Sequence, residues 1–107
     1  MDEKLLVTIF QIIGAAGSAK SNYMEAMAAA REGNFDEIDR LLKEGDDFYK
    51  EAHDIHIDLL GMQDSEEGLP TSLILIHAED QMMSAEQTRM MAEEFIYLYK
   101  DKYGVKD

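Results

Sequence analysis

The chain has 107 residues, a length that suits a single domain with a core that needs no disulfide bonds. It contains no cysteine, which excludes disulfides, thiolate nucleophiles and cysteine-based zinc sites. A formal net charge of -13 argues against nucleic acid and anionic membranes as partners and favours basic proteins. The apolar run from Leu5 to Ala19 is too short and too polar to span a bilayer, and the acidic N-terminus does not resemble a signal peptide. We therefore expect a cytoplasmic protein without direct membrane insertion.

Apolar residues recur at helical spacing in three segments, and no strand alternation or internal repeat competes with this pattern. The expected helices cover about residues 3–31, 35–62 and 70–103. Short links make neighbouring helices antiparallel. The sequence thus predicts an all-α protein, with residues 1–107 forming one up-down-up three-helix bundle.

Local signals set the expected helix ends. Glu32-Gly33 ends the first helix, and Asn34 is a good N-cap for the second, with Glu37 in capping-box position. Pro70 fits the first turn of the third helix, where no amide hydrogen bond is lost. Gly104 is its expected end.

The apolar surface of the third helix is wider than one core requires. A helix that covers one core shows an apolar stripe of roughly 100° or a little more. The apolar residues of the third helix wrap more than half of its circumference, which calls for a second partner, and self-association is the simplest explanation. The residues expected to be buried in the second helix are Ile38, Leu41, Leu42, Phe48, Tyr49, Ala52, His56 and Leu59.

The first helix contains an unusual run of small residues, Gly14-Ala15-Ala16-Gly17. Each glycine inside a helix costs up to ~1 kcal/mol relative to alanine. Small side chains in return allow another backbone, or a partner protein, to approach closely. We favour helix packing over ligand contact as the reason for this run.

A polar stripe interrupts the apolar third helix. His77, Asp80, Gln81 and Ser84 fall at i, i+3, i+4 and i+7 and therefore share one face. Burying such groups among leucine, isoleucine and methionine is unfavourable unless each finds a polar partner. The stripe therefore indicates chemistry or assembly on this helix.

The other histidines, His53 and His56, lie one turn apart on the second helix. They could orient His77, bind a metal or do neither, and the structural role is favoured. A di-iron bundle would need Glu-x-x-His units, which the three histidines do not provide. Phosphate-binding loops and the HExxH and GxSxG motifs are also absent from the sequence. What remains is a nucleophilic histidine, whose neutral imidazole can accept a phosphoryl group and later donate it.

The residues around His77 resemble a known active-site motif. The segment from Leu75 to Met83, together with Ala16-Gly17-Ser18-Ala19 and Ala52-His53, is similar to the lactose/cellobiose-type enzyme IIA of the bacterial phosphoenolpyruvate-dependent sugar phosphotransferase system. The resemblance runs over nearly the whole chain. It implies that His77 takes phosphate from the carrier HPr and passes it to the cysteine of a IIB component, in transport of lactose/cellobiose/chitobiose-type disaccharides.

The same resemblance implies a homotrimer in which Asp80 matches an aspartate that binds a divalent cation on the three-fold axis. One carboxylate per chain is a poor metal site, but three related by symmetry offer an oxygen cage suited to Mg²⁺. Without a cation, three converging carboxylates would repel one another. We therefore expect Asp80 to be the metal ligand.

The sequence departs from the family pattern at a few positions. Glu79 stands where the family commonly has Gln, Gln81 where it commonly has His, and His56-Ile57 replaces the usual Gln-Thr. Gln81 removes a possible ring partner near the phosphoryl site. His56 could compensate for that missing histidine.

Two other functions are compatible with parts of the sequence. A histidine-phosphotransfer domain of two-component signalling is also helical, but its motif has Lys three residues and Gly four residues after the histidine, where this chain has Asp80 and Gln81. A non-catalytic helical assembly module would explain the broad apolar third helix and would leave His77 structural. Phosphate exchange with HPr distinguishes the carrier from both alternatives.

Overall fold

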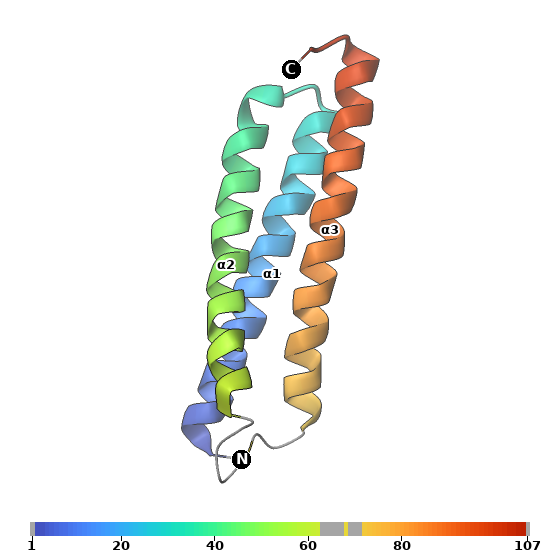
Figure 1. The fold of residues 1–107 in the computed structure, drawn as a ribbon. Coiled ribbons are helices and arrows are strands. Elements are labelled where there is room, and N and C mark those ends of the chain that lie inside the picture. The colour runs from blue at the N-terminus through green and yellow to red at the C-terminus, as the bar shows by residue number, and fades with distance from the viewer. Residues whose placement is uncertain (1, 63–67, 69–71, 107) are drawn as a thin grey trace.

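The structure is a computed structural model that describes residues 2–62, 68 and 72–106. Its described residues form the long helices α1 (Glu3–Arg31), α2 (Ile38–Gly61) and α3 (Leu73–Tyr103), and a short 3₁₀ turn, η1 (Phe35–Glu37). Figure 1 shows a rod in which α1 and α3 begin at the same end, and α2, the second helix in the sequence, runs in the opposite direction. The rod measures 58 × 20 × 17 Å. The prediction of an all-helical bundle is confirmed for the described residues.

Helix α1 organises the core because it packs along both other helices, whereas α2 and α3 have few contacts with each other. Its buried residues repeat in steps of three and four, the spacing of a helix with one packed face. Many of them are alanines, which lets the neighbouring helices approach α1 closely. The buried residues of this stripe are Leu5, Ile9, Ile12, Ala16, Ala19, Tyr23, Ala26 and Ala30.

The ends of α1 and α3 are capped as their sequences favour. Asp2 accepts a hydrogen bond of 3.0 Å from the backbone N–H of Leu5, and Ser72 accepts one of 3.2 Å from that of Leu75. Gly104 ends α3 in the left-handed conformation, with φ of 70°, which glycine adopts without strain. The expected position of Pro70 lies outside the described residues.

The predicted capping box at the start of the second helix is wrong. The side chain of Asn34 makes no capping hydrogen bond, and its ψ of 77° differs from the extended backbone of an N-cap. The turn η1 carries the chain from Asn34 to α2, which begins at Ile38. Glu37 instead accepts a hydrogen bond from the guanidinium of Arg40, one turn along α2.

The predicted burial of Phe48 is also wrong, because this side chain is exposed. The buried stripe of α2 continues from Leu41 to Gly45, and Tyr49 rather than Phe48 turns toward the core at the next step. Phe48 falls at the edge of that stripe and is 38% exposed. Most of the other positions expected in this core are buried or half-buried.

The tightest contact between α1 and α2 involves Gly45. A Cβ atom placed on this glycine would lie 2.6 Å from Cε1 of Tyr23 and 3.2 Å from Cβ of Asn22. The Tyr23 ring is only 2% exposed, and its hydroxyl donates a hydrogen bond of 2.6 Å to Asp46. The ring therefore has little freedom to move aside.

We expect Gly45→Ala to lower the free energy of unfolding by about 1–3 kcal/mol, because overpacking a rigid contact outweighs the gain in helix propensity. Urea unfolding followed by circular dichroism measures the change. Gly61→Ala is the matched control, since open space surrounds that glycine at the other end of α2. Equal stability of the two variants would show that the Tyr23 ring can move aside without a loss of stability.

Candidate functional site

Polar side chains bridge α2 and α3 along one seam. From one pair to the next, the residue number on α2 increases by three and then by seven, while the residue number on α3 decreases by the same amounts. The three pairs therefore belong to one antiparallel alignment of the two helices. Because these helices make few other contacts, the pairs do much to fix their spacing. The pairs are Asp46 with Arg89, Tyr49 with Glu86, and His56 with Glu79.

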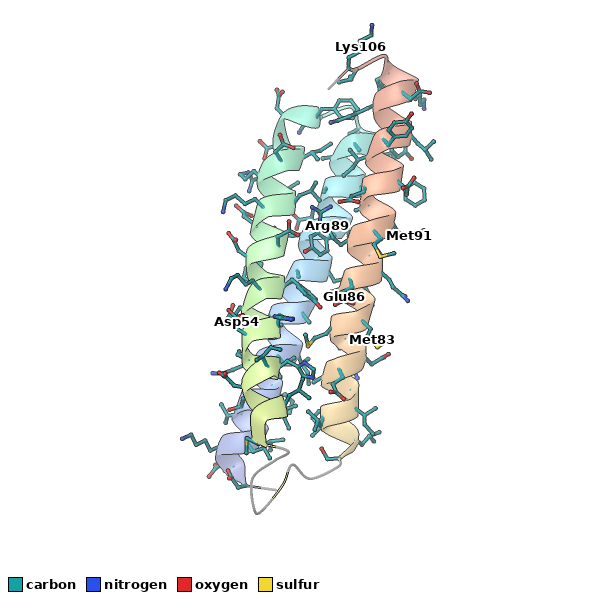
Figure 2. The ribbon with its side chains drawn as sticks, in the orientation of Figure 1. Asp54, Met83, Glu86, Arg89, Met91 and Lys106 are labelled. Carbon is teal, nitrogen blue, oxygen red and sulfur yellow. The ribbon has the colours of Figure 1, made fainter. Side chains whose placement is uncertain are left out.

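Arg89 joins all three helices at one point of this seam (Figure 2). Its Nε and Nη2 donate hydrogen bonds of 3.0 and 3.3 Å to the carboxylate of Asp46. Its guanidinium carbon lies 5.8 Å from the centroid of the Tyr23 ring. Burial opposes ionisation of Asp46, but hydrogen bonds from Arg89 and Tyr23 outweigh it and hold the pKa of that carboxyl below its ordinary value. This network is structural, since its polar groups satisfy one another.

The sequence pattern does not predict this network. Its one signal was the position of Arg89, which falls between Ala85 and Ala92 on the buried stripe of α3. An arginine at such a position needs an anionic partner from a neighbouring helix. Asp46 could not be chosen as that partner from the many acids of α2 without the axial register of the two helices.

His77 is the fifth residue of α3 and lies near the end of the rod where that helix begins. It is exposed and lines a hollow of about 510 Å³ together with Leu73 and Ile74. Leu73 is 83% exposed, the largest value among the exposed apolar side chains of the described residues. An imidazole in this setting is open to another protein and is bordered by apolar surface.

A single chain does not bury the polar stripe of α3. His77 and Asp80 are exposed, while Gln81 and Ser84 are half-buried. Among the described residues, none of the buried side chains is polar or charged. The reason is that α3 carries apolar residues on more than one face, and the face that packs on α1 is the one opposite Asp80.

A second apolar stripe runs along the exposed side of α3. Its residues follow one another in steps of three and four, as in a helix that packs in a coiled coil. Asp80 lies within this stripe, between Ile76 and Met83, and Figure 2 shows Met83 projecting from α3 away from α2. All of its members are exposed: Leu73, Ile76, Asp80, Met83, Gln87 and Met90.

The other two histidines do not turn toward His77. Nδ1 of His53 lies 3.9 Å from Asp54, and its ring centroid is 6.4 Å from that of Tyr49. Nε2 of His56 lies 2.7 Å from a carboxylate oxygen of Glu79. His56 and Glu79 are thus two departures from the family pattern that face each other, which favours a structural role for His56.

We expect the pair of His56 and Glu79 to contribute about 0.5–1 kcal/mol to stability, since Glu79 is partly exposed to water. A double-mutant cycle with His56→Ala and Glu79→Ala, followed by urea unfolding, measures this coupling. His53→Ala supplies the control, because the ring of that residue is half exposed. Additive effects of the two substitutions would contradict a direct interaction.

Asp80 is the predicted metal ligand. Among the described residues, no three His, Cys, Asp or Glu side chains of one chain form a group that could hold a metal ion. An exposed carboxylate nevertheless supplies the oxygen ligands that Mg²⁺ prefers. A site built on Asp80 would therefore draw its remaining ligands from other copies of the chain or from water.

None of the helices in the described part of the chain has the length and apolar character needed to cross a membrane. The helical rod presents His77 beside exposed apolar surface at the end where α3 begins. The family model for the lactose/cellobiose-specific IIA subunit of the phosphotransferase system matches residues 7–100. The chain therefore belongs to this family.

Individual relatives agree with that assignment. The chain is 34% identical to the oligo-beta-mannoside-specific EIIA component of Bacillus subtilis strain 168, over 87% of this chain and 84% of that protein. It is 33% identical to the lactose-specific EIIA component of Lactococcus lactis subsp. lactis, over 92% of this chain and 93% of that protein. The crystal structure of the cellobiose-specific enzyme IIA from Bacillus anthracis superimposes with a TM-score of 0.91 at 33% identity, covering 97% and 95% of the two chains. The protein is thus a phosphoryl carrier of sugar transport.

Proposed function

We propose that His77 is the residue that carries the phosphoryl group, taking it from phosphorylated HPr and passing it to the cysteine of a IIB component. The observation that carries this proposal is the exposure of His77 in an apolar hollow at one end of α3. A ring nitrogen of His77 attacks phosphorus as the bond to the histidine of HPr breaks. In the second step the IIB thiolate attacks phosphorus and His77 leaves.

Such a relay needs positioning more than it needs a set of catalytic groups. Helix α3 supplies that positioning, because Leu75 and Ala78 on either side of His77 in sequence are buried against the rest of the bundle. The helix backbone at His77 is therefore held while its side chain stays free. The partner proteins complete the surroundings of the phosphoryl group.

The second stripe of α3 supports our proposal that the protein is a homotrimer. Three copies of α3 packed along this stripe would cover Leu73, Ile76 and Met83, which one chain leaves in water. The same packing would bring three Asp80 carboxylates together. A divalent cation, Mg²⁺ by its preference for oxygen ligands, would neutralise them when bound.

We propose a disaccharide of the lactose, cellobiose or chitobiose type as the transported sugar. The support is the family description together with relatives named for lactose, cellobiose and oligo-beta-mannoside. The apolar hollow at His77 suits a protein surface rather than a sugar. Sugar choice is therefore expected to lie with another component of the transporter.

The test of the relay is incubation with phosphorylated HPr and then with IIB. The expected result is one acid-labile phosphate per chain, on His77, that is lost when IIB is added. Exchange with a response-regulator receiver domain but not with HPr would instead support a histidine-phosphotransfer domain. A trimer in sedimentation without phosphorylation by either donor would support an assembly module.

A further inference from the structure

A furrow runs between α1 and α2, which lie side by side along the rod (Figure 1). Near the start of α1 and the end of α2 it opens into a hollow of about 560 Å³, and none of the described residues that line this hollow belongs to α3. The hollow is at the same end of the rod as His77, but on the other two helices. It shares no residue with the second apolar stripe of α3, so a trimer joined along that stripe would leave the furrow open.

The apolar wall of the furrow is a row of side chains on α2. Phe48, Ile55 and Met62 follow one another at intervals of seven residues, so they point in nearly the same direction. Phe48 is 38% exposed and Met62 39%, while Ile55 is half-buried. The row spans about 20 Å along the helix axis. A line of that length suits a helix of about four turns better than a small molecule.

The opposite wall, on α1, carries few bulky side chains. Gln11 lines the hollow, and Ala15 follows it at the next helical step of four residues. Ala15 and Ala16 are buried, so the prediction that the small residues of α1 serve helix packing holds for them. It does not hold for Gly14 and Gly17, because no atom lies within 4 Å of a Cβ built on either glycine. A wall of this kind lets another helix approach α1 closely.

Acidic side chains border the furrow. Asp58 lines the hollow, Glu51 precedes it by seven residues on the same side of α2, and both are exposed. Asp2 adds another carboxylate to the lining of the hollow, and Lys4 adds an ammonium group. Because the whole chain also carries a formal net charge of -13, the furrow favours a cationic occupant. An anionic membrane or a nucleic acid would be repelled.

We infer that this furrow binds a basic amphipathic helix of a partner protein other than the phosphoryl donor and acceptor. The apolar face of such a helix would cover the apolar row of α2, as a third helix packs into the groove between two others. Lysine or arginine residues beside that face would pair with Glu51 and Asp58. Since His77 lies on α3, outside the furrow, binding is expected to be equally tight with and without a phosphoryl group on His77. The partner would hold the carrier without taking part in phosphoryl transfer.

The probe for this furrow is a fluorescent synthetic peptide of about 18 residues, or five helical turns, with leucines on one face and lysines beside them. Fluorescence anisotropy measures its dissociation constant for the full chain. A second peptide has the same composition but leucines on all sides of the helix, so it reports general attraction between opposite charges. We expect the amphipathic peptide to bind more tightly than this second peptide and to lose affinity as salt increases.

Two variants locate the binding of the amphipathic peptide. Gln11→Trp fills the hollow with an indole ring, and Glu51→Lys reverses a charge beside the apolar row. Both positions are exposed, so both variants should fold, which circular dichroism verifies. We expect each to raise the dissociation constant about tenfold. Asp39→Lys is the matched control, because it makes the same change of charge at an exposed position of α2 beyond the apolar row, and it should leave the affinity unchanged.

Several outcomes would overturn the inference. Equal binding of the two peptides, unchanged affinity in both furrow variants, or an equal loss in Asp39→Lys would show general attraction to an acidic chain. Loss of a trimer in Gln11→Trp, measured by sedimentation, would assign the furrow to a second copy of the chain. Slower labelling of the furrow variants by phospho-HPr would assign it to phosphoryl exchange. The binding results decide the inference even if phospho-HPr fails to label the unmodified protein, because the furrow does not include His77.

Discussion

Replacement of His77 by alanine is expected to remove phosphoryl acceptance from phospho-HPr completely. The carrier function needs a nucleophile that forms a covalent bond to phosphorus, and alanine offers none. The fold should survive, because the His77 side chain is exposed and contributes nothing to the buried core. Radiolabel transfer from phospho-HPr, with circular dichroism to verify helicity, measures both expectations.

The other histidines are the natural controls for that experiment. His53→Ala and His56→Ala should retain full labelling, because these residues pair with Asp54 and Glu79 and not with His77. The label should also be lost in acid and survive in alkali, as expected for a phosphorus–nitrogen bond. Labelling that persists in His77→Ala, or disappears in His56→Ala, would assign the phosphoryl group to a different residue.

The helices could be predicted because their periodicity and most of their end signals agree. The apolar spacing of α1 from Leu5 to Ala30 reports the packed face directly, and Gly33 and Gly104 each take the positive φ that ends a helix. Asn34 failed as a cap because capping depends on the backbone angles of the preceding turn, which composition does not fix. The prediction for Phe48 failed because this residue lies at the edge of the buried stripe of α2, where periodicity alone does not decide whether a side chain is covered.

The site could be predicted only in part, since two kinds of information are not local. The contacts across α2 and α3, such as His56 with Glu79, depend on the axial offset of two helices, and periodicity says nothing about that offset. The polar stripe posed a different problem. Helix α3 carries two apolar faces, and the sequence pattern does not say which face the same chain covers. The structure puts Asp80 on the uncovered one, and this is what makes its neighbours available to other copies.

If three Asp80 carboxylates bind Mg²⁺ in a trimer, the effect of Asp80→Asn on stability should change sign when the cation is removed. With Mg²⁺ bound, the unmodified trimer should be stabilised by about 2.7 kcal/mol at a concentration one hundred times the dissociation constant. After chelation this stabilisation is lost and the three carboxylates repel one another. Asp80→Asn removes both effects, so this variant should be less stable than the unmodified protein in Mg²⁺ and more stable in EDTA.

Thermal unfolding and sedimentation, each with Mg²⁺ and with EDTA, would measure that reversal. Asp58→Asn is a matched control, because it removes another exposed carboxylate, from α2 and away from the second stripe of α3. A general effect of Mg²⁺ on this acidic chain would shift all proteins alike, whereas a site at Asp80 leaves only Asp80→Asn insensitive. A trimer equally stable in EDTA and Mg²⁺ would mean that the apolar residues Ile76 and Met83 hold the assembly without a cation, and that Asp80 is tolerated there by hydration.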